Sequence, residues 1–265
     1  MFPSRHTFCR HALISIVLLS LTAAAMLLWQ EAPELRTSAS TVASARAGAA
    51  LPAVPAGGQF AISANLGRED SRYHAARRAG GFRGDNPRQG LQVDFTAKGT
   101  EIRSGGLRWH TGLRAMGYGD TLRDAPMATP TAEGNRIAYQ RGAVTEWYVN
   151  GPLGLQQGFT IASAPDGAGG DAPLTLALAP VTDLHLEVAP DKRGLRVIDQ
   201  GHGGATLHYT GLLAWDATGR ELPAWIETRD GQPLLRVNDT GASYPLTVDP
   251  FIQTAKLTAS DGYDG

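Results

Sequence analysis

The stretch from Leu212 to Asp249, LLAWDATGRELPAWIETRDGQPLLRVNDTGASYPLTVD, decides the fold class. Four apolar runs in it are separated by Thr218-Gly219, Asp230-Gly231 and Thr240-Gly241, at a spacing of roughly ten residues. Pairs such as Asp-Gly permit the positive φ that tight hairpins need. The stretch therefore predicts a meander of antiparallel strands in a sandwich or barrel.

Alternation of apolar and polar residues extends over most of the chain before this stretch. Leu91, Val93 and Phe95 alternate with polar residues, which places them on one face of a strand. The same pattern recurs at Ile137 and Tyr139, at Leu174, Leu176 and Leu178, at Leu184, Leu186 and Val188, at Leu207 and Tyr209, and at Tyr244, Leu246 and Val248. We expect an all-β, antiparallel β-sandwich-like domain with meander hairpins and about ten to thirteen strands.

One short helix is predicted inside the basic cluster that runs from Arg68 to Arg88. Ser71 is a good helix N-cap and Gly80 a good stop, so the expected helix covers residues 71–79.

The N-terminus carries an export signal. Arg5 and Arg10 precede Ala12 to Trp29, a run without charge that is long for a signal peptide and short for a membrane span. Residues 1–30 are therefore either a cleaved signal peptide or a retained membrane anchor. Basic residues before the apolar run keep the N-terminus in the cytoplasm and place the remainder outside.

A spacer and two further segments complete the predicted organisation. Residues 31–58 are rich in Ala, Ser, Pro and Gly and are predicted to be a disordered linker. Residues 59–250 form the predicted β-sandwich-like domain, and residues 251–265 the start of a further repeat.

Charge and cysteine usage exclude several classes of function. Without residues 1–30 the chain has 22 basic and 25 acidic residues, which argues against nucleic acid and anionic membrane surfaces as partners. The single cysteine, Cys9, precedes the apolar run, so the exported part has no thiol for a disulfide, a zinc site or a nucleophile.

No motif assigns a catalytic, cofactor-binding or metal-binding residue, and no cofactor is expected. The chain has no Gly-x-Ser-x-Gly elbow and no zinc-binding histidine spacing. A carboxylate pair assembled only in space stays open, because glycoside hydrolysis needs two acids about 5 to 10 Å apart. The candidates on or beside predicted strands are Glu146, Glu187, Asp199, Asp216, Glu221 and Glu227.

Four tryptophans beyond the apolar run leave a carbohydrate-binding site open, because flat indoles stack on sugar rings. Trp215 and Trp225 flank a predicted hairpin with apolar neighbours and are expected in the core. Trp109 and Trp147 are the remaining candidates for stacking.

The run from Tyr244 to Pro250, YPLTVDP, followed by AKLTASDG at residues 255–262, resembles a junction in large secreted bacterial proteins. There a β-rich N-terminal domain passes into FG-GAP-type, integrin-α-like β-propeller repeats. Segments upstream resemble the body of that same domain: NPRQGL from Asn86, TEWYVN from Thr145, GLQQGF from Gly154 and WDATGRELP from Trp215.

The resemblance implies a module without enzymatic activity, in front of repeats associated with adhesion and calcium binding. No Asp-x-Asp-x-Asp-Gly loop follows, so those calcium sites carry over to no residue here, and Asp261 and Asp264 are only a fragment of a repeat. The leading hypothesis is a non-catalytic, extracytoplasmic structural or interaction module with an unknown protein or glycan partner. The alternatives are a carbohydrate-binding or carbohydrate-active domain, and an anchored fragment without retained function.

Overall fold

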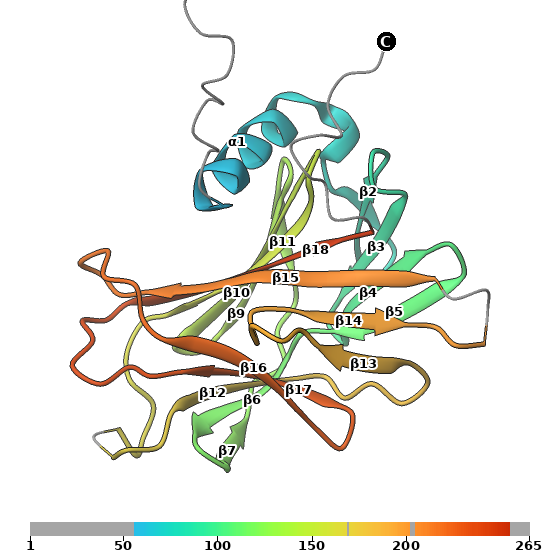
Figure 1. Ribbon diagram of the computed structural model, residues 1–265. Coiled ribbons are helices and arrows are strands. Elements are labelled where there is room, and N and C mark those ends of the chain that lie inside the picture. Colours follow the sequence, from blue (N-terminus) through green and yellow to red (C-terminus); the bar gives the residue numbers. More distant parts are fainter. Residues whose placement is uncertain (1–55, 169, 202–204, 255–265) are drawn as a thin grey trace, which may run out of the picture. The chain divides into compact units, whose positions relative to one another are not determined.

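The computed structural model describes residues 56–168, 170–201 and 205–254. Within these ranges the chain is mostly antiparallel β-structure in three sheets, with one α-helix and one 3-10 turn (Figure 1). This confirms the predicted all-β, antiparallel class. The predicted apolar segment at residues 12–29 and residues 255–265 of the predicted repeat at 251–265 lie outside the described residues. No helix among the described residues is long and apolar enough to cross a membrane.

The first sheet, called here the N-terminal sheet, is a simple meander in which each strand pairs with the next. The alternating residues Leu91, Val93 and Phe95 are buried on its inner face, as predicted. Its strands are β1 (Ala76–Arg78), β2 (Gly81–Asn86), β3 (Leu91–Thr96), β4 (Gly99–Ser104) and β5 (Leu107–Thr111).

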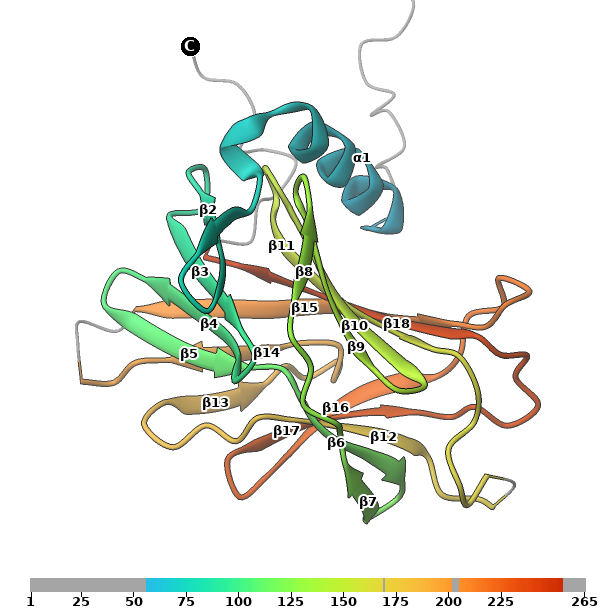
Figure 2. The ribbon, with the colours of Figure 1, turned by 180° about the vertical axis from the view of Figure 1, so that it is seen from behind.

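The second sheet, the large sheet, has eight strands and joins distant parts of the sequence. Its central strands β15 and β18 run side by side in Figures 1 and 2 and pair in antiparallel register. In spatial order its strands are β13 (His185–Val188), β14 (Leu195–Ile198), β15 (Thr206–Trp215), β18 (Leu246–Gln253), β11 (Gly154–Ile161), β10 (Val144–Gly151), β9 (Arg136–Arg141) and β8 (Thr131–Glu133).

The third sheet, the small sheet, has five strands. Its central strand is completely buried, because all five residues from Leu174 to Leu178 are enclosed. In spatial order its strands are β16 (Ala224–Arg229), β17 (Gln232–Val237), β12 (Leu174–Leu178), β6 (Leu113–Tyr118) and β7 (Thr121–Asp124).

The stretch Leu212–Asp249 contains one local hairpin rather than a continuous meander. Asp230 and Gly231 have φ of 49° and 73° and connect β16 to β17, as the sequence predicted. The strands on either side, β15 and β18, leave this hairpin and pair with each other in the large sheet. The predicted four-strand meander is therefore wrong at its first and last turns.

Asp216 explains how the chain crosses between sheets at both of those turns. Its carboxylate accepts hydrogen bonds from the backbone N–H groups of Thr218 and Arg220 in the first crossover and of Ser243 in the second. The Thr218 hydroxyl and these amides hold the pKa of Asp216 well below its usual range. One buried carboxylate thus fixes two loops that are distant in sequence.

The helical prediction is wrong in position. Residues Ser71–Tyr73 form a single 3-10 turn, capped by Asp70, and Ala76–Arg78 form strand β1. Sheet pairing with β2 supplies β1 with the backbone partners that a helix would otherwise provide. The α-helix of the described chain, α1 (Ala56–Glu69), lies before this segment and begins inside the predicted linker.

Helix α1 packs across the end of the β10–β11 hairpin (Figures 1 and 2). Its Phe60 ring stacks on Phe251 of β18, with centroids 4.5 Å apart, and Ser63 Oγ accepts from Leu153 N at 3.0 Å. Strand β18 therefore belongs to the domain as far as Gln253, beyond the predicted boundary at residue 250.

Three asparagine side chains fasten this end of the domain. Asn150 Nδ2 donates to the carbonyl oxygens of Tyr73 and Asp85, and Asn150 Oδ1 accepts from Asn86. Asn135 Nδ2 donates to the carbonyl oxygen of Ala64 in α1. Asn86, Asn135 and Asn150 are all buried, so their amide groups link helix, turn and sheets where water does not compete.

All three sheets contribute to one continuous apolar core. Trp109 of the N-terminal sheet packs edge-to-face on Tyr209 of the large sheet, with centroids 5.5 Å apart. Phe95 and Tyr148 make a similar contact at 5.2 Å. Aromatic pairs of this geometry stabilise the packing of one sheet on another.

Candidate functional site

The six carboxylates proposed for glycoside hydrolysis are held by separate structural partners. Glu146 pairs with Arg141, Glu187 with Arg196, Asp216 with Arg220, Glu221 with Arg193 and Glu227 with Arg236; Asp199 accepts from Gly201 N. The structure does not join any two of them by a shared arginine in the described residues.

A pair that the sequence did not single out lies on the N-terminal sheet. Asp94 and Glu101 are direct cross-strand neighbours, and Arg103 forms ion pairs with both. Arg83 also pairs with Asp94 at 2.9 Å and holds the pKa of Asp94 below its usual value. A general acid needs a carboxyl group that keeps its proton near neutral pH, so this pair suits a surface ion network instead.

Glu146 is the centre of a buried polar cluster on the inner face of the large sheet. Its Oε2 accepts from Arg141 Nε at 3.0 Å. Its Oε1 accepts from the Tyr148 hydroxyl at 2.8 Å, from Gln157 Nε2 at 3.1 Å and from Leu113 N at 3.2 Å. Glu146 has no exposed surface, so every one of these donors compensates for lost hydration.

The cluster continues to Tyr209, whose hydroxyl donates to Gln157 Oε1 at 3.0 Å. Burial raises the pKa of Tyr148 and of Tyr209 well above the usual value, so both stay neutral donors. A fully satisfied cluster of this kind rigidifies a core.

The tryptophans proposed for sugar stacking are enclosed. Trp109 is 1% exposed and Trp147 is 8% exposed, with Trp147 lying against Gly158 beneath the Arg136 guanidinium. Trp215 and Trp225, which were expected in the core, are only half-buried. The two candidates for sugar stacking are therefore the more buried pair, and the prediction that Trp215 and Trp225 lie in the core is wrong.

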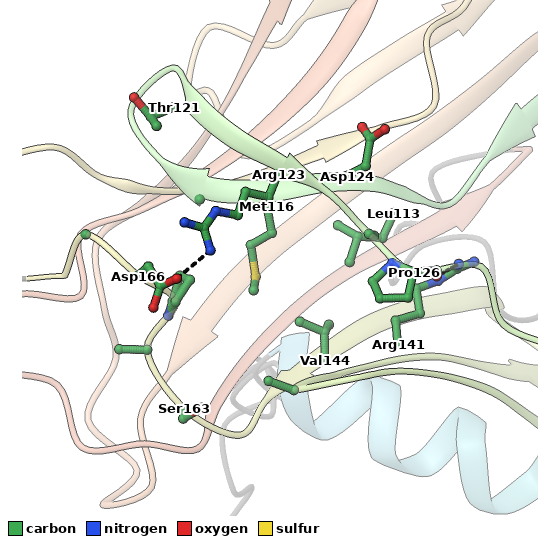
Figure 3. Close-up of a pocket in the computed structure, with 16 residues that line it drawn as sticks. Leu113, Met116, Thr121, Arg123, Asp124, Pro126, Arg141, Val144, Ser163 and Asp166 are labelled. Carbon is green, nitrogen blue, oxygen red and sulfur yellow. Dashed lines mark hydrogen bonds and ion pairs between the residues drawn. The ribbon is translucent and has the colours of Figure 1, made fainter.

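A hollow of the described surface lies between strand β7, the β9–β10 turn and the loop at residues 163–167 (Figure 3). Its volume is about 470 Å³. Leu113, Met116, Pro126 and Val144 line it, and Met116 points into its middle. We call it the apolar hollow.

Charged groups stand at the two ends of the apolar hollow. At one end Arg123 of β7 forms an ion pair with Asp166 of the loop. At the other end Arg141 donates from Nη1 to the carbonyl oxygen of Pro126 at 2.8 Å. Asp124 points away and lies 3.5 Å from Arg114. All four charged side chains that line the hollow thus have an oppositely charged partner.

One further buried carboxylate, Asp249 of β18, has an unusual environment. Its Oδ2 accepts from Gln156 Nε2 at 2.7 Å, whereas its Oδ1 has no hydrogen-bond partner in the described part of the chain. Burial raises the pKa of Asp249 to about 7.

The described residues contain no group of three or more His, Cys, Asp or Glu that could hold a metal ion. Asp261 and Asp264 lie outside the described residues.

Comparison with known proteins finds no matching family model, no matching curated protein and no matching solved structure. Function has to be argued from the geometry of this chain.

Proposed function

We propose that this protein is a non-catalytic, extracytoplasmic interaction module, a β-sandwich-like domain that precedes a β-propeller and binds an apolar group of its partner. The observation that carries the proposal is the apolar hollow. Most of the residues that line it are apolar, and its volume of about 470 Å³ falls within the range of small-molecule and side-chain pockets.

The chemistry of the hollow supports binding rather than catalysis. Its four ionisable side chains, Arg123, Asp124, Arg141 and Asp166, are all engaged in ion pairs. Acid–base catalysis needs a side chain that is free to exchange a proton with a substrate, and each of these four side chains is instead engaged with an oppositely charged neighbour. Ser163 and Thr121 offer hydroxyl groups without a lining histidine to activate them.

The extracytoplasmic location and the propeller partner rest on the sequence. The apolar run at Ala12 to Trp29 with its basic flank is the argument for export, and the junction resemblance from Tyr244 onward is the argument for the propeller. The carbohydrate alternative loses support from the burial of Trp109 and Trp147, because a stacking platform needs an exposed indole face.

The test uses methionine methyl groups as probes. The chain has four methionines, and of the two that the structure describes Met116 points into the apolar hollow whereas Met127 does not line it. We expect N-acetyl-leucinamide to shift the methyl signal of Met116 and leave that of Met127 unchanged in protein labelled at the methionine methyl carbon. Met116→Leu assigns the signal.

An unchanged Met116 signal at millimolar probe would contradict the binding function. Turnover of glycoside or ester substrates that disappears in Glu146→Gln, with the fold retained by circular dichroism, would contradict the non-catalytic assignment.

A further inference from the structure

A second hollow adjoins the first. Its volume is about 280 Å³, and it shares Leu113, Ala125 and Arg141 with the apolar hollow. Lys98 and Arg114 also line it. We call it the basic hollow, because three cationic side chains and no acidic one line it.

The cations of the basic hollow are incompletely neutralised. Lys98 has no carboxylate partner among the described residues, and Arg114 lies 3.5 Å from Asp124, with both side chains more than half exposed. Arg141 uses Nε for Glu146 and Nη1 for Pro126, so its Nη2 makes no hydrogen bond to the described chain. Positive charge and free donors thus gather beside an apolar cavity.

A buried hydroxyl adds a further polar atom without a partner. Thr111 lines the basic hollow and is 2% exposed, and its Oγ1 has no hydrogen-bond partner in the described part of the chain. Buried polar atoms are nearly always paired, so this hydroxyl is an unsatisfied group close to the wall of the hollow.

Glu146 limits the charge that the basic hollow can accept. A β-carbon on Gly112, which lines the hollow, would lie 3.3 Å from Glu146 Oε1, so this carboxylate lies directly beneath the wall. Glu146 offsets the charge of Arg141, which leaves Lys98 and the weakly paired Arg114 to attract an anion. A singly charged group fits this balance better than a doubly charged phosphate.

We propose that the two hollows together bind a carboxylate that carries an apolar group, and this rests on the binding function proposed above. The carboxylate lies in the basic hollow within reach of Lys98, Arg114 and Arg141 Nη2. Its apolar part lies against Met116 in the adjoining apolar hollow. Two sources offer this chemistry: a free aliphatic acid, and the C-terminus of a peptide that ends in an apolar residue.

The experiment compares each acid with its uncharged amide in the purified full chain. Hexanoate is compared with hexanamide, and acetyl-Ala-Leu with a free C-terminus is compared with the same peptide amidated. We expect at least one acid to bind about tenfold more tightly than its amide, a difference of about 1.4 kcal/mol. That acid should shift the methyl signals of both Met116 and Met127, because Met127 lines the basic hollow.

Lys98 and Arg114 are exposed, so substitutions at these positions are expected to leave the fold intact. Lys98→Gln and Arg114→Gln should each reduce the affinity for the acid toward that of the amide, whereas Arg68→Gln, which lines neither hollow, should leave it unchanged. Added salt should weaken binding of the acid and not of the amide, since exposed charges are screened.

The outcomes separate this inference from the function on which it rests. Equal affinity for acid and amide, with a shift at Met116, overturns the carboxylate assignment and leaves the apolar binding function in place. Failure of every acid and amide to bind overturns both. Binding of hexanoate identifies a free aliphatic acid as the ligand class, and binding of acetyl-Ala-Leu identifies the C-terminus of a peptide.

Discussion

Arg141 Nε lies 3.0 Å from Glu146 Oε2, and the two side chains are 6% and 0% exposed. The pair forms part of the wall between the apolar hollow and the polar cluster of the core. Because Glu146 also accepts from Tyr148, Gln157 and the backbone N–H of Leu113, loss of its carboxylate leaves a buried charge and three buried donors without this acceptor.

Glu146→Ala should therefore lower the free energy of unfolding by about 3–5 kcal/mol, the usual cost of breaking a buried ion pair on one side. Urea denaturation followed by circular dichroism measures this difference. Glu221→Ala is the matched control, since Glu221 pairs with Arg193 at 2.8 Å on the surface, where such pairs contribute less than about 1 kcal/mol. Equal losses in the two variants would contradict the structural role assigned to Glu146.

Asp249 should make the domain less stable as the pH rises. The folded-state pKa is about 7 against a reference value of 3.8, so the folded protein holds a proton that the unfolded chain has lost. Stability attributable to this group is greatest below about pH 4, falls between pH 4 and 7 by up to about 1.4 kcal/mol per unit, and then levels off.

The variant Asp249→Asn should remove this pH dependence and be more stable than the parent at pH 8. The amide keeps an acceptor for Gln156 and carries no charge at any pH. The measurement is the difference in the free energy of unfolding between parent and variant at pH 4, 6 and 8. A difference that is the same at all three values would refute the prediction.

Gly158→Ala should disrupt the packing of the large sheet. A β-carbon at this position would lie 2.1 Å from Cζ2 of Trp147, so the indole ring has to move. We expect a loss of about 1–3 kcal/mol in the free energy of unfolding, as for other overpacked sites, and a red shift of tryptophan emission. Gly57→Ala in α1 is the control, because nothing lies within 4 Å of its added carbon. An unchanged emission spectrum in Gly158→Ala would count against the prediction.

Local signals in the sequence predicted individual strands but not their number, since about ten to thirteen were expected and the described chain has eighteen. The Asp230-Gly231 turn has both residues at positive φ, and Leu91, Val93 and Phe95 face the core, because hairpin geometry and alternation depend on neighbouring residues alone. The pairing of β15 with β18 depends on contacts across about forty residues of chain, which no local pattern contains.

Helix α1 was missed for a related reason. Gly57, Gly58 and Gly67 give it a poor intrinsic propensity, so its stability comes from contacts such as Phe60 on Phe251. Tertiary packing overrides propensity at this position.

The candidate site could not be predicted from the spacing of residues along the sequence. Glu146 was singled out, and its partner Arg141 lies only five residues away on the β9–β10 hairpin, but the lining residues Met116 and Asp166 come from separate segments that only the fold brings together. Burial of Trp109 was detectable, since it alternates with the polar residues Arg108 and His110 along one strand.

The asparagine contacts that fasten α1 have a consequence for the conditions under which the domain holds together. Asn86, Asn135 and Asn150 carry no ionisable group, and their partners are backbone carbonyls, one backbone N–H or each other. Neither acid nor concentrated salt changes the charge of these amide groups. Both weaken the arginine–carboxylate ion pairs of the N-terminal sheet, such as Arg83 with Asp94 and Arg103 with Glu101. The helix should therefore stay attached under conditions in which the surface ion network has already loosened.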